Sequence, residues 1–234
     1  MVHSLCSHFS HSTAGELTLT DSTEPPLPKP ANTRNSCNSS GAELYIITPV
    51  SRYKLKEDLL RIAVSIRWDC VSKWLLVYDT ERQHDLEPLF SESPQVTEIY
   101  FHAEEGANFG NMQRNKGLEK VMQGLVYFLD DDNIMHPSFW EILPNMKLGH
   151  ITTFDEARME ENPPRIFEGM TVAVGCIDTA MYVVDRALIG DTRWHMNAFD
   201  ADGQFVEQIY SNHSDKHVYI PEVAAYHHGL VIPG

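Results

Sequence analysis

Four short apolar runs, rich in β-branched and aromatic residues, alternate with helical patterns between residues 44 and 133. The runs cover residues 44–50, 73–79, 96–102 and 125–133, and the helical patterns cover residues 56–68 and 111–124, where Gly124 is a candidate C-cap. Strands that alternate with helices indicate βαβ units, so we expect an α/β fold with a mostly parallel central sheet flanked by helices. Ligands of such folds bind beyond the carboxyl ends of the strands.

The fourth run, VYFL, leads directly into three carboxylates, Asp130, Asp131 and Asp132. Three adjacent aspartates at the end of a buried strand need a cation or hydrogen-bond donors nearby. Mn²⁺ and Mg²⁺ are commonly held by one or two carboxylates, with substrate phosphates and water completing the shell. We therefore expect a metal at this strand end that bridges the protein and a diphosphate. The alternative is a solvated turn in which Asp132 and Asn133 cap a helix that begins near residue 136.

Composition limits the classes of protein that fit. The 234 residues, 42% of them hydrophobic, can build one domain. Residues 1–42 are rich in Ser, Thr, Asn and Pro and predict a disordered tail, with a docking motif or a targeting remnant as alternatives; residues 43–234 form the domain. The net charge of −15 disfavours nucleic acid and anionic membranes as partners.

Cysteine spacing and hydropathy bear on the compartment. Cys6, Cys37, Cys70 and Cys176 are far apart and form no CxxC pair, so we expect reduced thiols rather than a disulfide scaffold or a zinc site. No apolar run approaches the ~20 residues that span a bilayer. The N-terminus also lacks the apolar segment of a signal peptide, and we expect a cytoplasmic protein without a transmembrane segment.

The segment NFGNMQRNKG, residues 108–117, lies just upstream of the carboxylates. Gly110 lets the backbone approach a ligand closely, and Arg114 can pair with a phosphate through two hydrogen bonds. A polar loop with a solvated arginine is the alternative for this segment taken alone.

The order TPVSR, VYD, NFGNMQRNKG and VYFLDDDN resembles glycosyltransferases of the GT-A fold. The pattern Asn-x-Gly followed by Arg-Asn-x-Gly is similar to family 2, and YFLDDDN is similar to family 43, the β-1,3-glucuronyltransferases. The resemblance implies a single Rossmann-like domain with a nucleotide-binding half at residues 43–135 and an acceptor half at residues 136–234. It also implies a nucleotide-diphosphate sugar as donor, a UDP-sugar first, and a glycan or other hydroxyl as acceptor.

The resemblance assigns the donor site residue by residue. The candidates for binding the donor are Thr48, Pro49 and Arg52 in the first loop, Asp79 at the nucleobase, Arg114 at the nucleotide or its diphosphate, and Asp131 at the ribose. Asp130 is expected to assist the metal site or to be held by an arginine. Asp132 is implied as the main ligand of Mn²⁺ or Mg²⁺. His227 is our choice for a histidine near the metal, and His228 is the alternative.

The C-terminal half is expected to supply the sugar pocket and a base. Residues 170–190 predict two short strands around a loop at residues 175–179, followed by a helix, and the resemblance places Asp178 and Thr179 at the sugar pocket. An amphipathic helix follows Asp200 and Asp202. The resemblance implies that one of these two carboxylates is the general base, and the spacing to the helix favours Asp202. Because Ala201 stands where the family usually has Glu, Asp200 remains the alternative. The alternative role of Asp202 is helix capping.

Residues 154–169 are polar and contain prolines. They predict either a lid, with Arg158 or Arg165 reaching phosphate, or a solvated loop. Together the motifs favour a metal-dependent glycosyltransferase that inverts the sugar's configuration. The alternatives are a degenerate sugar-nucleotide or glycan-binding module and, less favoured by the first loop, a nucleotidyltransferase. A dehalogenase-type phosphohydrolase would need its aspartates on the first strand.

Overall fold

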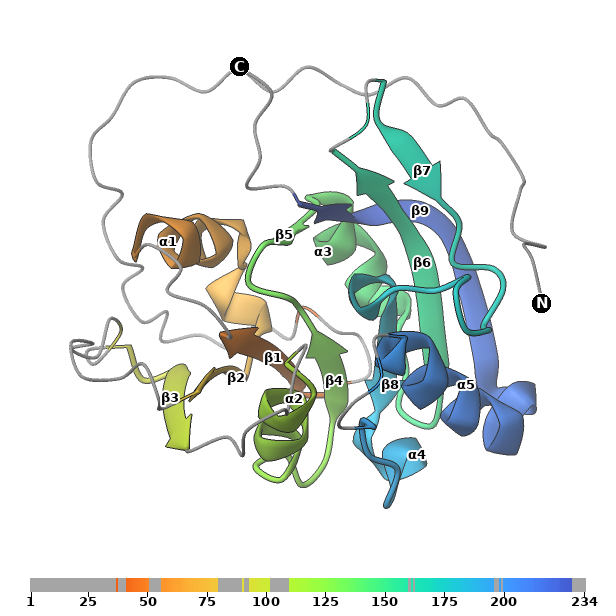
Figure 1. Cartoon of the computed structure of the whole chain (residues 1–234), viewed down its shortest axis with the longest axis horizontal. Coiled ribbons are helices and arrows are strands. Elements are labelled where there is room, and N and C mark those ends of the chain that lie inside the picture. Colours follow the sequence, from red (N-terminus) through yellow and green to blue (C-terminus); the bar gives the residue numbers. More distant parts are fainter. Residues whose placement is uncertain are drawn as a thin grey trace.

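The computed structural model describes residues 37, 41–50, 56–79, 90, 93–101, 110–159, 161, 163–195, 198 and 200–228 (Figure 1). These residues form one sheet in the order β3-β2-β1-β4-β8-β6-β9-β5, with β7 paired to β6. The strands are β1 (Leu44–Val50), β2 (Lys73–Asp79), β3 (Val96–Phe101), β4 (Leu125–Phe128), β5 (Ile134–Met135), β6 (Ile151–Arg158), β7 (Arg165–Phe167), β8 (Tyr182–Asp185) and β9 (His217–His227). The helices are α1 (Lys56–Ser65), α2 (Asn111–Leu118), α3 (Ser138–Ile142), α4 (Arg186–Ile189) and α5 (Ala201–His213), with 3-10 turns η1 (Trp68–Cys70), η3 (Leu143–Asn145), η4 (Thr179–Met181) and η5 (Ser214–Lys216).

The first half of the sheet is parallel, as predicted. β1 pairs with β2 and β4, and β2 pairs with β3, all in parallel register. Because side chains alternate along a strand, Ile46 faces one side of the sheet and Ile47 the other. α2 covers the second side, and Gly117 makes this packing possible, since a Cβ there would lie 2.5 Å from Cγ2 of Ile47.

Helix α2 is shorter than its sequence pattern, which extends to Gly124. The helix ends at Leu118, and its C-cap is Glu119. Gly124 instead adopts a φ of 95° in the turn before β4, where a Cβ would lie 2.6 Å from the carbonyl oxygen of Glu43. The glycine therefore serves the entry to β4, and its prediction as the helix C-cap is wrong.

The second half of the sheet is mixed. β8 is antiparallel to both β4 and β6, while β6 and β9 are parallel. Of the two strands predicted within residues 170–190, only the second forms, as β8; residues 170–178 are turns and irregular chain. The helix start expected after it is α4, and the predicted amphipathic helix is α5.

The polar segment at residues 154–169 is neither of the two structures predicted for it. Its described residues instead form the antiparallel pair β6–β7. The buried Asp155 accepts hydrogen bonds from the Gly169 amide at 2.9 Å and the Tyr219 hydroxyl at 2.8 Å. Because these partners satisfy the carboxylate, a strand residue that looks like a loop residue can be buried.

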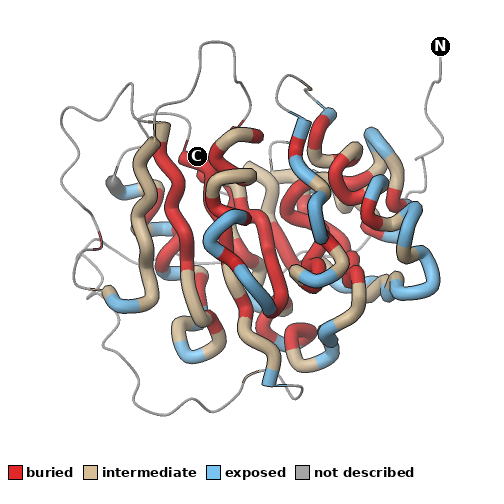
Figure 2. Tube along the Cα trace, turned by 90° about the horizontal axis from the view of Figure 1, so that it is seen from below, coloured by how far each residue is buried: buried red, intermediate tan, exposed pale blue. Residues whose placement is uncertain are grey.

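Two hydrophobic cores lie on opposite faces of the sheet. One includes side chains of α1 and α3, such as Leu59 and Phe139, and the other includes side chains of α2 and α5, such as Leu118 and Phe205. Figure 2 shows the central strands buried along most of their length, with the exposed segments on helices and turns. The strands thus form a rigid layer whose carboxyl edge carries the candidate site.

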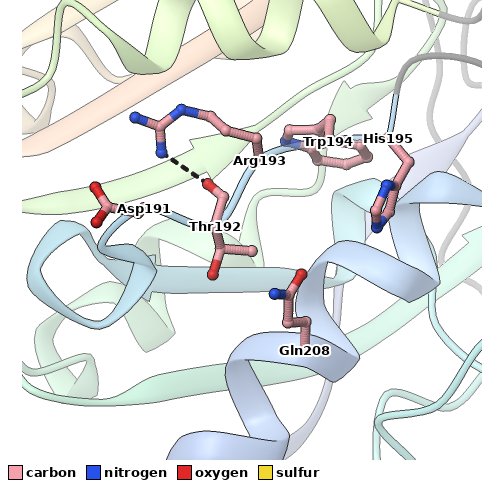
Figure 3. Close-up of a pocket in the computed structure, with 6 residues that line it drawn as sticks. All are labelled: Asp191, Thr192, Arg193, Trp194, His195 and Gln208. Atoms are coloured by element: carbon pink, nitrogen blue, oxygen red, sulfur yellow. Dashed lines mark hydrogen bonds between the residues drawn. The ribbon is translucent and has the colours of Figure 1, made fainter.

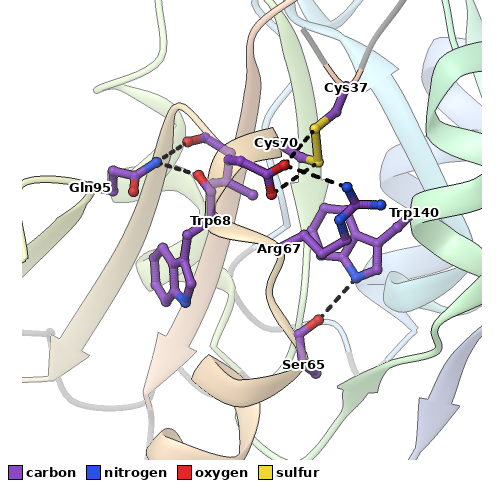
Figure 4. The surroundings of a disulfide bond; sticks show 9 residues. Cys37, Ser65, Arg67, Trp68, Cys70, Gln95 and Trp140 are labelled. Atoms are coloured by element: carbon purple, nitrogen blue, oxygen red, sulfur yellow. Dashed lines mark hydrogen bonds and ion pairs between the residues drawn. A yellow bond between two sulfur atoms is a disulfide. The ribbon is translucent and has the colours of Figure 1, made fainter. Parts of the chain in front are cut away.

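A disulfide joins Cys37 to Cys70 of the turn before β2 (Figure 4). Next to it, Gln95 donates to the carbonyl oxygens of Trp68 and Val71, both at 2.6 Å. The expectation of reduced thiols is therefore wrong for this pair. Disulfides persist mainly in oxidising surroundings. No local pattern predicts this bond, since the two cysteines are 33 residues apart and belong to no motif.

Two further predictions concern the compartment and the tail. No described helix is long and apolar enough to cross a membrane. The cytoplasmic location stays a prediction, and the disulfide weighs against it. Of the predicted tail, residues 1–36 and 38–40 lie outside the described residues, whereas Cys37 is bonded to the domain.

Candidate active site

The three consecutive aspartates follow β4 and face different partners. Asp130 pairs with the guanidinium of Arg114. Asp131 is only 7% exposed, and Asp132 lies with a carboxylate oxygen 3.3 Å from Nδ1 of His228. The backbone turns sharply here, since the amide of Asn133 donates to the carbonyl oxygen of Asp130 at 3.1 Å. The run therefore divides into an inner carboxylate neutralised by arginine and an outer one beside a histidine.

Arg114 is a buried cation, 5% exposed, on α2. Besides Asp130, it donates to Oδ1 of Asn111 at 3.1 Å and lies 4.6 Å from the centre of the Trp194 ring. Burial is the largest single influence and would lower the pKa of Arg114, but the charge and hydrogen bond of Asp130, together with the weaker influence of Tyr182 and Asp202, raise that pKa on balance, so the guanidinium stays charged. The predicted contact of Arg114 with a diphosphate stays a prediction.

His227, the last residue of β9, and His228 lie near aspartates because β5 and β9 are paired. Ile134 is in register with Tyr226, which brings residues 227 and 228 beside the turn after β4. Asn133 accepts from the amide of His228 at 3.0 Å, and His228 has a φ of 49°, a left-handed conformation that is uncommon outside glycine. The fold therefore holds this imidazole against Asp132 at some cost in backbone conformation.

A second charged group surrounds Asp178. Its carboxylate lies 3.5 Å from Nη2 of Arg158 and 3.9 Å from Nε2 of His227, and the rings of the two adjacent histidines are 4.1 Å apart. Arg158 also donates to the fully buried Glu156 at 3.2 Å and stacks on the ring of Phe167 at 4.3 Å. His227, our choice for the metal, thus faces Asp178, and His228 faces Asp132.

The two candidate bases occupy different surroundings. Asp200 is exposed and accepts from the side chain of Gln204 at 2.8 Å. Asp202 lies in the first turn of α5, and burial followed by the neighbouring charge of Asp178 raises its pKa to about 6. Arg114 and Asp130 also act on Asp202, which places its carboxylate in the field of both charged groups.

The remaining predicted residues differ in accessibility. Thr48 is fully buried and accepts from Nε1 of Trp74 at 2.8 Å, so its hydroxyl is committed to the core. Pro49 is buried next to Gly110, where a Cβ would lie 2.9 Å from it. Asp79 ends β2 and is partly exposed, whereas Thr179 is only 2% exposed. Arg52 lies outside the described residues.

Sequence reasoning missed the roles of Asn115 and Trp194. Asn115 accepts from the amide of Trp194 at 2.9 Å and donates to its carbonyl oxygen at 3.0 Å. Asn111 donates to the carbonyl oxygens of His195 at 2.8 Å and Ala198 at 3.2 Å. These partners are about 80 residues away in sequence, and the only signal was the density of amides in NFGNMQRN.

A pocket of about 450 Å³ lies away from the aspartates (Figure 3). It is lined by Asp191, Thr192, Arg193, Trp194, His195 and Gln208. Asp185, the last residue before α4, pairs with Leu125, the first residue of β4. The three aspartates follow the other end of β4, so the chain that leads into the pocket starts at the opposite end of the sheet. Arg193 is already occupied by the carbonyl oxygens of Gly190 at 3.1 Å and Thr192 at 2.9 Å. The lining of the pocket includes none of the predicted site residues, although Trp194 also lies 4.6 Å from Arg114.

Metal binding can be judged from the donor atoms present. Among the described residues, one trio of candidate ligand atoms lies within 4.8 Å, formed by Cys37, Asp69 and Cys70, and its two sulfur atoms are bonded to each other. Asp132 and His228 instead offer a carboxylate and an imidazole 3.3 Å apart. Two such ligands fit a Mn²⁺ or Mg²⁺ whose remaining positions are taken by phosphate and water.

Known structures share this fold, although sequence comparisons find no relative. No family model and no curated protein matches the sequence. The structure resembles S. aureus TarS with a TM-score of 0.56 at 12% identity, over 79% of this chain and 36% of that one. For TarS 1–349 in complex with UDP, the TM-score is 0.57 at 13% identity, over 79% of this chain and 60% of that one. For its complex with UDP-GlcNAc, the TM-score is 0.57 at 12% identity, over 79% of this chain and 58% of that one.

This likeness confirms the predicted single-domain α/β fold of the GT-A type, a curled and mostly parallel sheet flanked by helices. The chain spans less than two thirds of the TarS structures that it matches. At 12–13% identity, the likeness concerns the fold and not individual residues.

Proposed function

We propose that the chain transfers a sugar from a nucleotide-diphosphate donor, first of all a UDP-sugar, to an acceptor hydroxyl with inversion at the anomeric carbon. The observation that carries the proposal is a chain of contacts beside the turn after β4, in which Asp132 lies 3.3 Å from His228, the rings of His228 and His227 are 4.1 Å apart, and His227 lies 3.9 Å from Asp178. The charge of Asp178 in turn acts on Asp202. TarS structures of the same fold hold UDP and UDP-GlcNAc, which supports this class of donor.

The donor would lie at the edge formed by β1, β2 and β4. Asp79, the last residue of β2, is proposed to accept from the uracil N3–H, and Asp131, three residues after Phe128 at the end of β4, is proposed to accept from the ribose hydroxyls. Asp132 together with His228 would hold Mn²⁺ or Mg²⁺. When bound, this ion would neutralise charge on the departing nucleoside diphosphate.

Asp202 is the proposed general base. Its carboxylate would accept the proton of the acceptor hydroxyl while that oxygen bonds to the anomeric carbon and the bond to the diphosphate breaks. A base with a pKa of about 6 is ionised at neutral pH and still basic enough to take the proton. Asp178, fixed by Arg158 and His227, is proposed to accept hydrogen bonds from hydroxyls of the transferred sugar.

The test is release of nucleotide by the purified chain with UDP-, GDP- and dTDP-sugars, with and without Mn²⁺, with glycan and simple hydroxyl acceptors. We expect turnover with a UDP-sugar that requires the metal, and loss of about 100-fold or more in Asp132→Ala and Asp202→Asn. The matched control is Asp200→Asn, because this exposed carboxylate lies two residues from the proposed base.

Donor binding, followed by thermal shift, separates the alternatives. Stabilisation by UDP-sugars without any turnover would indicate a binding module, and release of diphosphate from a nucleoside triphosphate would indicate a nucleotidyltransferase. A protein that no nucleotide stabilises contradicts the donor site itself. His228→Ala against His227→Ala decides between the histidines, and we expect the larger loss of metal-dependent binding in His228→Ala.

A further inference from the structure

The segment between α4 and α5 is held by side chains rather than by secondary structure. Within its described residues, Asn115 bonds to both the amide and the carbonyl of Trp194, at 2.9 and 3.0 Å. Asn111 adds bonds to the carbonyl oxygens of His195 and Ala198. Because a single amide side chain satisfies both polar groups of the Trp194 backbone, it fixes the position of this residue against α2 as a strand partner would.

The ring of Trp194 then links α2 to α5. It is 2% exposed, with Arg114 4.6 Å from its centre and Phe205 stacked on it at 4.7 Å and 13°. Phe128 of β4 meets both rings edge-on, at 5.1 Å from Trp194 and 5.5 Å from Phe205. Phe205 lies three residues after Asp202, one turn along the same face of α5. The stack therefore fixes the rotation of the helix at the turn that carries this carboxylate.

The first turn of α5 is also held from its other side. A Cβ at Gly203 would lie 2.7 Å from Cα of Val174, so the backbone of the 174–175 turn packs directly on the helix. The first turn thus lies between the Trp194–Phe205 stack and the turn that leads to Asp178. Neither contact involves a group that would touch a substrate.

We propose that Asn115 and Trp194 are positioning residues, which hold α5 so that Asp202 stays within reach of the acceptor hydroxyl. The expected effect on kcat rests on the proposed function. The expected effect on the position of α5 rests on the contacts alone. Loss of the clamp moves the base without removing any ligand of the donor. A shift of about 1 Å at a reacting group costs about 100-fold in rate.

The kinetic test compares Asn115→Ala, Trp194→Ala and Trp194→Phe with wild type. We expect kcat to fall about 10- to 100-fold in the two alanine variants, while KM for the donor changes less than about 3-fold. Trp194→Phe keeps an aromatic ring against Phe205 and should recover most of the rate. Lys116→Ala is the matched control, since this exposed neighbour on α2 pairs only with Glu119 among the described residues.

Hydrogen exchange of the α5 amides, measured on the same variants, tests the structural half without any substrate. We expect faster exchange at residues 203–206 in Asn115→Ala and unchanged exchange in Lys116→Ala. Unchanged exchange in Asn115→Ala overturns the proposal, and so does a rise in donor KM that accounts for the whole loss of activity. If wild type shows no transfer, the proposed function fails, and the exchange data alone decide whether the clamp holds α5.

Should Asn115→Ala fail to fold, Asn115→Asp keeps the acceptor and the size of the side chain, but it removes the donor to the Trp194 carbonyl and adds a negative charge there. The same exchange and kinetic criteria then apply. Wild-type exchange and wild-type kcat in that variant would overturn the proposal.

Discussion

The two charged groups beside β4 are built differently. The closed group, Arg114 with Asp130, Asn111 and Trp194, has its arginine 5% exposed and enclosed on several sides. In the open group, Asp132 with His228, the side chains are 30% and 40% exposed and 3.3 Å apart. One run of three aspartates therefore serves two purposes: its first member completes a buried ion pair, and its last can still receive a ligand from solvent.

The largest expected effect breaks the closed group. Arg114→Met leaves the Asp130 carboxylate without its cation, and removing one partner of a buried ion pair costs about 3–5 kcal/mol. Chemical denaturation measures the loss in the free energy of unfolding. Arg165→Met, at a side chain 43% exposed, should stay within about 0.5 kcal/mol. A loss below about 1 kcal/mol for Arg114→Met would mean that the closed group is not structural.

The second prediction concerns the glycine that admits Arg114. Gly110 and Gly149 both have a φ of 75°, but a Cβ at Gly110 would lie 2.9 Å from Pro49 and 3.2 Å from Nη1 of Arg114, whereas nothing lies within 4 Å at Gly149. We expect Gly149→Ala to cost about 1 kcal/mol from backbone conformation, and Gly110→Ala about 1–3 kcal/mol more from crowding. Equal melting temperatures for the two variants would contradict close packing around the closed group.

Asp202, on which the charges of Asp178, Arg114 and Asp130 act, links stability to pH. Its folded pKa of about 6 is above the ordinary value of 3.8, so the folded state binds the proton more tightly than the unfolded state. Stability from this residue is therefore full below about pH 4 and is lost as pH rises through about 6, by about 3 kcal/mol. Asp202→Asn should flatten this part of the unfolding profile.

The same residue should set the acidic limb of kcat/KM against pH, because kcat/KM reports the pKa values of the free enzyme. Under the proposed function, the rate of wild type rises as pH passes through about 6, where Asp202 loses its proton. If the acidic limb of the pH–rate profile is unchanged in Asp202→Asn, another residue is the general base.

The smallest effect on stability is expected in the open group. A partly exposed ion pair contributes about 0–1 kcal/mol, so Asp132→Asn should leave the free energy of unfolding nearly unchanged. Metal-dependent binding of a UDP-sugar should nevertheless be lost in this variant. A loss of stability as large as that of Arg114→Met would erase the distinction between the groups.

The parallel half of the fold could be read from the sequence because its signals are local. β1 and β2 coincide with the predicted runs at residues 44–50 and 73–79, each an apolar segment with clear ends. β6 was missed because its buried Thr152, Thr153, Asp155 and Glu156 look like loop residues until partners such as Tyr219 and Gly169 are known.

The candidate site shows the same difference between local signals, which the sequence carries, and long-range partners, which it does not. The acidic run was predicted from residue type and its position at the end of a strand, and Asp202 from the resemblance and its spacing to the helix that follows; their roles stay predictions. Which histidine meets Asp132 depends on the pairing of β5 with β9, which brings together residues about 95 positions apart. Such long-range partners leave no periodic trace in a single sequence, and the Asn115–Trp194 contact, 79 residues apart, was hidden for the same reason.

Trp194 has an optical consequence. Of the four tryptophans, Trp68, Trp74 and Trp140 belong to the core under α1 and α3, and Trp194 alone belongs to the opposite core. A guanidinium 4.6 Å from its ring perturbs the indole electronically. Any ligand that draws Arg114 towards a phosphate would change that field and shift the emission of Trp194. The chain therefore carries its own fluorescent probe, next to the residues proposed to recognise the donor.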